Sequence, residues 1–285
     1  MQGPKLSVVV VVYDMPHQIV RTIRSLSPAM QRGITADEYE LLVVDNGSPE
    51  PIDRAACEAF GARIRWFDVP DATSSPAPAA NLGLREAAGG IVGVLIDGAR
   101  MASPGMLAHA LLAARLHERP VISTLSYHLG RRPQYVSAAA GYDEAAETAL
   151  LATVDWEGDG YRLFDVAVPG HAAFHWFRRP FESNAVFMPA AMWAELGGFD
   201  EGFRSDGGGL VNPDLYVRAT ELPGARTVSL LGEATFHQVH GGVSTNRVLA
   251  ESPLEDWHEE YEELRGQRFA GAADPILCVG TPAPQ

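Results

Sequence analysis

Gly90-Ile91-Val92-Gly93-Val94-Leu95-Ile96-Asp97-Gly98-Ala99-Arg100 is the stretch that decides the fold of this chain. Its apolar run, broken only by Gly93, predicts a strand buried on both faces, as in parallel sheets covered by helices. Asp97 then lies at the carboxyl end of that strand, the edge where open α/β sheets bind ligands. A carboxylate there can hold a divalent cation, and Gly98 lets a phosphate approach the backbone. The alternative is an Asp that only bonds its own turn.

The chain before this stretch also predicts a parallel sheet. Residues 6–13 and 39–44 are continuous, β-branched apolar runs that are typical of central strands, and residues 17–26 between them have helical spacing. A strand, a helix and a second strand in so short a length indicate a βαβ unit with a right-handed crossover. We therefore predict an α/β fold, with a mostly parallel central sheet flanked by helices.

The rest of the chain alternates between helical and extended patterns, with a less regular stretch at residues 130–170. Residues 174–181 form an aromatic and cationic cluster, suited either to stacking on a ring or to packing a satellite core. The tail from residue 251 predicts an acidic helix at 256–264, followed by a Gly/Ala/Pro-rich end of disordered composition. The other predicted helices are 53–61, 79–88, 106–117, 189–196 and one from Asn212, and the other strands are 64–67, 120–125, 182–188 and 228–236.

Composition excludes several classes of function. The 285 residues carry 22 basic and 36 acidic side chains, a net charge of −14, which disfavours nucleic acid and anionic membranes as partners. Two cysteines, Cys57 and Cys278, are too few for a disulfide framework. The apolar run at residues 6–12 is too short to span a bilayer, and no cationic leader precedes it. We expect a cytoplasmic protein with no membrane span and no nucleic-acid partner.

Successive motifs of the chain resemble those of family 2 glycosyltransferases with the GT-A fold. They span residues 6–247, and their order makes the resemblance specific. It implies a Rossmann-like sandwich of GT-A type, with one catalytic domain at residues 1–250 and a C-terminal helix and tail at 251–285. Within that domain, residues 1–100 would form the nucleotide-binding half and residues 101–250 the acceptor half. The motifs are Val12-Tyr13-Asp14, Val44-Asp45-Asn46-Gly47-Ser48, Asn81-Leu82-Gly83, Ile96-Asp97-Gly98-Ala99-Arg100, and Gly197-Gly198-Phe199-Asp200-Glu201 before Asp214-Leu215.

In such enzymes the first two strand ends hold the nucleotide of a sugar donor. The resemblance places Tyr13 beside the base, Asp45 in a hydrogen bond with the base or ribose, and Asn81 facing the nucleotide or its diphosphate. Asp45 also begins a sequence that forms a turn in any protein, and Asn81 can simply initiate a helix. The candidate nucleotide-binding residues are Val12, Tyr13, Asp45, Asn81, Ile96, Asp97 and Gly98.

The metal turn departs from the family pattern. The family usually has Asp-x-Asp, whereas this sequence keeps Asp97 and has Ala99 in the second place. A histidine can complete the ligand shell together with donor diphosphate oxygens, and a nitrogen ligand favours Mn²⁺ over Mg²⁺. His237 and His240 are the candidates, since late histidines bind metal in several GT-A enzymes. Residues three apart on a strand point to opposite faces, so we expect only one to bind unless the chain turns there.

The residue that would activate the acceptor is also changed. Transfer with inversion requires a base that takes the acceptor proton. Inverting relatives place an acidic pair before the last Asp-Leu, and Val211-Asn212 occupies that position here. Asp214 is the nearest carboxylate, although it also suits a helix-dipole role. Asp206 and Glu182 are the alternates, and retention, in which the donor phosphate takes the proton, stays open.

These features predict a metal-dependent glycosyltransferase of the hexosyltransferase class. It would move a sugar from a nucleoside-diphosphate sugar, with UDP or GDP as the nucleotide, to a hydroxyl of a glycan or small molecule, using Mn²⁺ or Mg²⁺. A homodimer is the candidate assembly. One alternative is a catalytically silent nucleotide-sugar-binding module, because of Ala99 and Asn212. A second is a nucleotidyltransferase, although Tyr13-Asp14-Met15-Pro16 lacks the glycine-rich, basic character of its phosphate loop.

Overall fold

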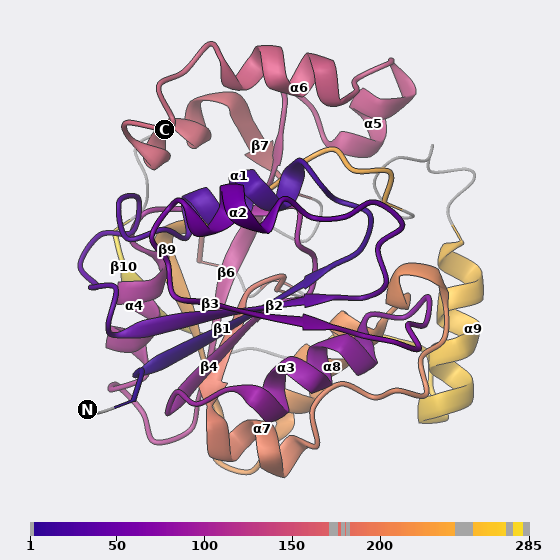
Figure 1. Ribbon diagram of the computed structural model, residues 1–285. Helices are drawn as coiled ribbons and strands as arrows, with labels where there is room; N and C mark the ends of the chain where they lie inside the picture. Colours follow the sequence, from indigo (N-terminus) through magenta and orange to yellow (C-terminus); the bar gives the residue numbers. More distant parts are fainter. Residues whose placement is uncertain are drawn as a thin grey trace.

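A twisted sheet crosses the middle of the molecule, with helices on both of its faces (Figure 1). The computed structural model describes residues 3–170, 176–177, 180, 183–242, 253–271 and 276–281. Within these residues the sheet has ten strands, eight of them in the order β10-β9-β6-β8-β4-β1-β2-β3. The strands are β1 (Leu6–Val12), β2 (Tyr39–Asp45), β3 (Ile64–Asp68), β4 (Ile91–Leu95), β5 (Arg100–Ala102), β6 (Pro120–Leu129), β7 (Ala167–Pro169), β8 (Val186–Pro189), β9 (Arg226–His237) and β10 (Ile276–Gly280).

Most neighbouring strands are parallel, as the sequence predicts. Strands β3, β2, β1 and β4 run in one direction, and β6, β9 and β10 are parallel to one another. Strand β8 is antiparallel to both of its neighbours, β4 and β6. The short strands β5 and β7 pair antiparallel with β9 and β6. The carboxyl ends of β1, β2 and β4 therefore meet at one edge of the sheet, where ligand sites of such sheets form.

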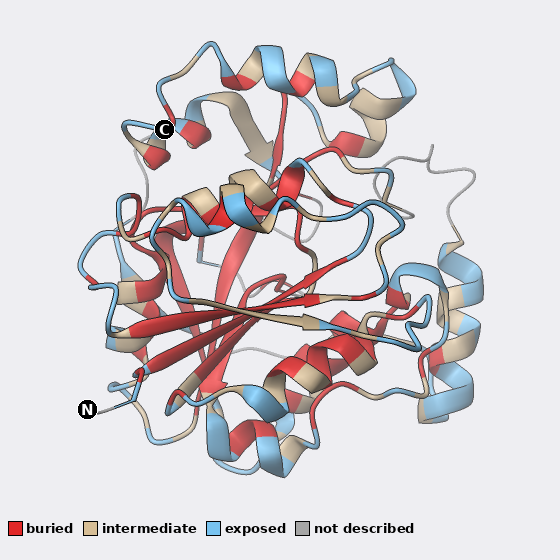
Figure 2. Ribbon diagram, viewed as in Figure 1, coloured by how far each residue is buried: buried red, intermediate tan, exposed pale blue. Residues whose placement is uncertain are grey.

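Two cores cover the two faces of the sheet. In β1, Val8 and Val10 pack in the cluster that includes α1 and α4, whereas Val9 and Val11 pack in the cluster that includes α3, α7 and α8. This alternation follows from the two-residue period of a strand, and Figure 2 shows the central strands buried. The helices are α1 (Gln18–Ser25), α2 (Arg54–Glu58), α3 (Ala77–Glu86), α4 (Met106–Ala113), α5 (Gln134–Ala139), α6 (Glu144–Leu151), α7 (Ala190–Leu196), α8 (Val211–Glu221) and α9 (Leu254–Arg265), with 3₁₀ turns η1 (Gly160–Val166) and η2 (Asp206–Gly208).

The glycine inside the deciding stretch has a packing reason. A Cβ added at Gly93 would lie 2.3 Å from the ring of Phe187 on the neighbouring strand β8. Because Phe187 is fully buried there, only glycine leaves room for it at this point of β4. The apolar run is therefore interrupted by glycine because the Phe187 ring of the neighbouring antiparallel strand packs over β4 at this point.

Three parts of the chain differ from the sequence-based expectation. The stretch 130–170 contains α5, α6, η1 and β7, and β6 continues to Leu129 instead of ending at residue 125. Residues 276–280, expected to be disordered, form β10 at the edge of the sheet, paired with β9. Within the cluster at 174–181, Trp176 is buried and packs near Tyr127 and Phe164, which favours the satellite-core interpretation for that residue. No described helix has the length and apolar character needed to cross a membrane.

Candidate active site

A large cavity opens at the carboxyl edge of the central strands and has a volume of about 1200 Å³. It is lined by residues that follow β1 and β2, by the turn after β4 and the end of β9, and by the start of α8 and α9. The cavity thus joins all the segments that the motifs single out. Its lining includes Tyr13, Asp14, Asn46, Thr73, Ile96, Asp97, Arg100, Asp206, Asn212, His237, His240, Trp257, His258 and Phe269.

Asp97 stands in the turn between β4 and β5, and its carboxylate does two things. One oxygen, Oδ1, accepts a hydrogen bond from the Ala99 backbone N–H at 3.0 Å, which is the turn-forming role. The other, Oδ2, accepts from Arg100 Nε at 3.0 Å. Arg100 is fixed in turn by the Ser126 hydroxyl, 2.6 Å from its Nη1. Ala99 is fully buried in the core, so the second place of the usual Asp-x-Asp pair points away from solvent here.

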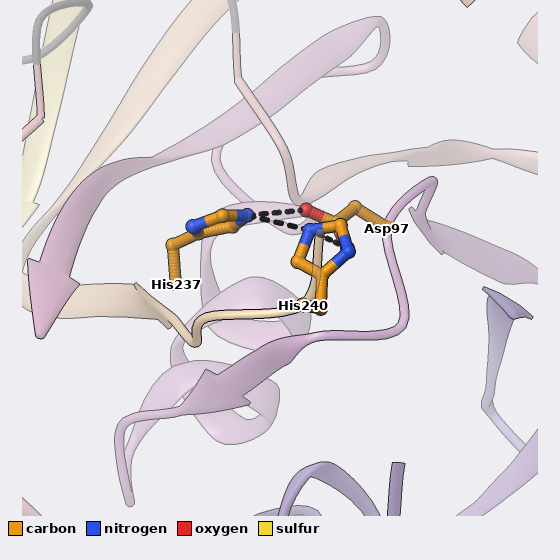
Figure 3. A group of neighbouring side chains, drawn as sticks. All are labelled: Asp97, His237 and His240. Carbon is orange, nitrogen blue, oxygen red and sulfur yellow. Dashed lines mark hydrogen bonds and ion pairs between the residues drawn. The ribbon is translucent and has the colours of Figure 1, made fainter. Parts of the chain in front are cut away.

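Both late histidines reach Asp97. Strand β5 pairs with β9 so that Arg100 lies opposite His237, which brings the end of β9 beside the Asp97 turn. His237 Nε2 is 3.1 Å from Asp97 Oδ2, and His240 Nε2 is 3.7 Å from Asp97 Oδ1. The two Nε2 atoms are 3.0 Å apart. Figure 3 shows the two rings and the carboxylate directed toward one another.

The two histidines converge because the chain turns after β9. Gln238, between them, is fully buried and donates from Nε2 to Thr22 Oγ1 and to the Gln18 carbonyl, both at 3.1 Å on α1. Its backbone N–H donates to the Ala99 carbonyl at 2.9 Å. The strand geometry that would separate residues three apart therefore ends at His237. The condition attached to the sequence prediction, a turn at this point, is met.

Burial and charge set the protonation of the three groups. Burial would raise the pKa of Asp97, but His240 in its protonated form, the permanent charge of Arg100 and the contact with His237 outweigh it and hold that pKa well below its usual range. Burial, aided by Arg100, lowers the pKa of His237 to about 3. Burial likewise lowers the pKa of His240, against the opposite effect of Asp97. An ionised carboxylate therefore faces two neutral imidazoles.

This donor set fits a divalent cation. The ligand atoms of Asp97, His237 and His240 all lie within 4.8 Å of one another. Three lone-pair-bearing atoms facing one point leave a demand for positive charge there, which a metal ion satisfies. One oxygen and two nitrogen ligands suit Mn²⁺ better than Mg²⁺, which prefers an all-oxygen shell.

The candidate nucleotide-binding residues after β1 and β2 differ in whether they line the cavity. Tyr13 is 55% exposed and lines the cavity, whereas Val12 is fully buried in the core. Asp45 accepts from the Ser48 backbone N–H at 2.8 Å, the turn role, and is not part of the cavity lining. Its neighbour Asn46 does line the cavity and is buried.

Asn46 is a functional candidate that the motif reasoning missed. Its Nδ2 donates to the Thr73 carbonyl at 2.9 Å, and its Oδ1 is buried without a hydrogen-bond partner in the described part of the chain. A buried carbonyl oxygen without a donor is costly unless a ligand satisfies it. Asp14 was missed as well. It has a positive φ of 52°, a strained backbone for a non-glycine residue, and it too lines the cavity.

Two other nucleotide candidates lie outside the cavity wall. Asn81 on α3 donates from Nδ2 to the Phe199 carbonyl and to Glu201, both at 2.9 Å, and accepts from the Phe199 N–H. It therefore ties α3 to the Gly198 turn and borders a second, smaller pocket. Gly98 packs so closely on β1 that an added Cβ would lie 2.8 Å from the Val11 carbonyl. Ile96 does line the cavity.

The candidate catalytic residues also differ in whether they line the cavity. Asp206, in η2, lines the cavity, and the backbone N–H of its neighbour Gly207 donates to the Ser74 carbonyl at 3.0 Å. Asp214 is fully buried in α8, faces Arg218 and Arg265, and is not part of the lining. Asn212 lines the cavity and donates to the Ser183 carbonyl at 3.2 Å. Glu182 lies outside the described residues.

Helix α9 supplies an apolar wall of the same cavity. Its Trp257 and His258 line the cavity, together with Phe269 from the segment that follows. Glu260 of the same helix accepts from the backbone N–H groups of Arg204 and Ser205, at 2.6 and 3.0 Å, and so holds the loop that leads to Asp206. A tryptophan in an otherwise acidic helical segment is the sequence signal for this wall.

Comparisons with known proteins support the fold and the family resemblance. Residues 7–111 match the family model "Glycosyl transferase family 2". No curated protein matches the sequence significantly. Among solved structures, S. aureus TarS aligns with a TM-score of 0.57 and 17% identity, over 92% of this chain and 40% of that chain. TarS 1-349 in complex with UDP-GlcNAc aligns with a TM-score of 0.58 and 15% identity, over 91% and 65%.

A third structure, the mannosyltransferase PcManGT from Pyrobaculum calidifontis in complex with GDP-Man and Mn²⁺, aligns with a TM-score of 0.53 and 17% identity, over 83% of this chain and 57% of that chain. The chain thus spans from 40% to 65% of the length of these proteins. Fold and sheet order define a GT-A sandwich with a mostly parallel sheet, so the predicted fold class is confirmed. The predicted resemblance to family 2 glycosyltransferases is confirmed over residues 7–111, which match the model of that family.

Proposed function

We propose that this chain is a metal-dependent glycosyltransferase that moves a sugar from a nucleoside-diphosphate sugar to a hydroxyl group. The observation that carries the proposal is the convergence of Asp97, His237 and His240 in the middle of a cavity that begins at the ends of β1 and β2. The solved complexes with UDP-GlcNAc and with GDP-Man and Mn²⁺ share this fold, which supports the same class of donor here.

The metal would be held by Asp97 Oδ2 or Oδ1 and by the Nε2 atoms of the two histidines. When bound, a divalent ion neutralises charge that develops on the leaving nucleoside diphosphate. Arg100 fixes the orientation of the Asp97 carboxylate through the hydrogen bond that its Nε donates to Oδ2, at 3.0 Å. The protein therefore presents a preformed carboxylate and two neutral imidazoles that need no proton removal before a cation binds.

The nucleotide would lie against the Tyr13 and Asn46 end of the cavity. Uracil and guanine both carry a ring N–H next to a carbonyl group, and the unpartnered Asn46 Oδ1 can accept a hydrogen bond from such a group or from a ribose hydroxyl. Tyr13, exposed beside it, offers a ring face for stacking. These contacts favour a base such as the uracil of UDP or the guanine of GDP over adenine or cytosine, which lack a ring N–H of this kind.

The acceptor would enter beside the start of α8 and α9, the part of the cavity called the acceptor end below. Among the described residues that line the cavity, Arg100 is the single arginine or lysine, and Asp97 and Ser126 already engage it. This charge distribution favours an uncharged acceptor over a phosphorylated one. Trp257 and Phe269 offer apolar ring surface to a glycan or a small molecule.

Asp206 is the carboxylate best placed to take the acceptor proton. It lines the acceptor end, and the backbone of its loop is held by Glu260 of α9. Asp214 instead serves the packing of α9 through Arg265. In this proposal residues 1–250 form the catalytic domain and residues 251–285 an addition that closes the acceptor end. The homodimer and the cytoplasmic location stay predictions.

A thermal-shift screen with UDP, GDP and dTDP sugars, with and without Mn²⁺, tests the proposal. We expect the melting temperature to rise with a UDP or GDP sugar only when Mn²⁺ is present, because a bound ligand stabilises the folded state. Release of free nucleotide from that donor would then show turnover. A donor that binds with Mn²⁺ but never yields free nucleotide, with any acceptor offered, would instead favour the catalytically silent module. Equal shifts with and without Mn²⁺ would contradict the metal role.

A further inference from the structure

The segment between β6 and β7, residues 130–166, is called the lobe below and contains α5, α6 and η1. Figure 1 shows α5 and α6 at the top of the view, beyond α1. Two lobe side chains, Gln134 and Glu147, have no exposed surface. Both contact the short turn that carries the two candidate metal-binding histidines.

Gln134 contacts the ring of His237 on the side away from Asp97. Its Oε1 is hydrogen-bonded to His237 Nδ1, while its own backbone N–H donates to His128 Nδ1 at 2.8 Å. A histidine that binds a metal through Nε2 carries its ring proton on Nδ1, and an amide oxygen placed at Nδ1 can accept that proton. His237 Nε2 lies 3.1 Å from Asp97 Oδ2. Gln134 is therefore placed to hold the ring in the tautomer and plane that a metal ligand needs.

Glu147 contacts the backbone between the two histidines. Its Oε2 accepts from the Val239 N–H at 2.9 Å, and on the other side of the same residue Gln18 Nε2 donates to the Val239 carbonyl at 2.7 Å. Val239 is therefore held from α6 and from α1 together. Without this turn, His240 would continue along β9 and could not return to within 3.7 Å of Asp97 Oδ1.

We propose that Gln134 and Glu147 are positioning residues of the metal site, so that the lobe preorganises both imidazoles for a divalent cation. The proposal rests on the proposed metal-dependent function. Gln134 sets the tautomer and ring plane of His237, and Glu147 sets the turn that brings His240 to the same point. Residues that hold a metal ligand in place without touching the metal typically lower metal affinity 10- to 100-fold when they are removed.

Mn²⁺ binding to the full chain without nucleotide tests this directly, with free Mn²⁺ measured by electron paramagnetic resonance. We expect Gln134→Leu and Glu147→Leu each to weaken Mn²⁺ binding by about 10- to 100-fold. Gln134→Glu and Glu147→Gln keep an acceptor oxygen and should stay within a few-fold of wild type. Glu144→Gln, one turn earlier on α6, is the matched control and should bind as wild type does. Circular dichroism at each titration temperature verifies that every variant is folded.

A second measurement does not depend on how well the leucine variants fold. In wild-type protein without metal, ¹⁵N NMR of the imidazoles should show His237 protonated on Nδ1 and not on Nε2. The proposal is overturned if the proton is found on Nε2, or if folded Gln134→Leu and Glu147→Leu bind Mn²⁺ as wild type does. In the latter case the metal site itself still stands. A wild-type chain that binds nucleotide but no Mn²⁺ overturns the metal-dependent function and this inference together.

Discussion

Arg265 binds both carboxylate oxygens of Asp214, with Nε 2.6 Å from Oδ1 and Nη2 2.8 Å from Oδ2. The same Nη2 donates to Asp200 Oδ2 at 2.7 Å. The hydrogen bonds to Asp214 and Asp200 raise the pKa of Arg265 above its usual value. The last turn of α9 is thereby fastened to α8 and to the loop after α7. Because α9 also carries Trp257, this buried ion pair decides where one wall of the cavity lies.

Arg265→Gln should destabilise the protein by about 2 to 4 kcal/mol, because it leaves the buried Asp214 carboxylate with Arg218 as its remaining cation. Urea unfolding measures the change. Arg268→Gln is the matched control, since Arg268 forms an equally short, two-pronged pair with Glu255 that is exposed to solvent. Exposed pairs contribute little to stability, because water and salt screen them, so the control should lose much less than Arg265→Gln. Equal losses in the two variants would contradict a docking role for Asp214.

Asp97→Ala should abolish Mn²⁺-dependent nucleotide binding while the fold stays intact. The variant removes the one anionic ligand of the three-residue site, and its remaining partner Arg100 keeps the Ser126 contact. Isothermal titration with UDP or GDP in the presence of Mn²⁺ measures the loss, and the far-ultraviolet spectrum reports the fold. Unchanged nucleotide affinity would count against the assignment of the site.

Asp206→Asn should lower kcat about 100-fold or more and leave donor binding unchanged, if Asp206 takes the acceptor proton. The side chain lines the acceptor end and is not among the residues near the metal ligands. Initial rates with saturating donor give kcat, and the thermal shift with donor and Mn²⁺ reports donor binding. A variant with the full rate would exclude Asp206 as the base and favour retention, in which the donor phosphate takes the proton.

Glu147 should make the stability of the protein fall as the pH rises. Burial raises its pKa to about 8, against the Val239 N–H and Arg21, with Glu144 acting in the same direction as burial. The folded state therefore keeps a proton that the unfolded chain releases near its ordinary pKa of 4.5. This stabilisation is complete below about pH 4.5 and is lost as the pH rises through about 8, at up to about 1.4 kcal/mol per pH unit.

Urea unfolding at several pH values between about 5 and about 8 measures this effect. Glu147→Gln has no proton to lose in that window, so its stability should change less with pH than that of wild type. The groups that face Glu147 are Arg21, Tyr142, Glu144 and the Val239 N–H. Parallel curves for the two proteins would show that Glu147 does not titrate there.

The sequence predicted the sheet and its covering helices because those elements have strong periodicity. The run at residues 6–12 and the stretch that ends in Asp97 each form a buried strand where expected. Asp97 and both histidines could be predicted because the family motif leads to them. Their convergence could not, since it depends on β5, a three-residue strand with no periodic signal, which pairs Arg100 with His237.

Other parts of the site have no local signature. Gln134 and Glu147 lie in a stretch without regular apolar spacing, and their importance arises only from contacts with residues about a hundred positions away. Asp45 and Asn46 are adjacent and equally polar, so the sequence alone could not decide which faces the cavity. Ala99 is different. Its fully buried position explains why an acidic side chain there would cost free energy.

The pairing of β10 with β9 has a consequence for synthesis of the chain. Strand β9 carries His237 and pairs with β6 on one side. On its other side, β5 covers residues 235–237 and residues 276–280 cover residues 227–231. Until the ribosome has released residues 276–280, the first part of β9 keeps an open row of backbone donors and acceptors. Such an edge recruits other nascent chains, so versions that end before residue 276 should give aggregates that the 285-residue chain avoids.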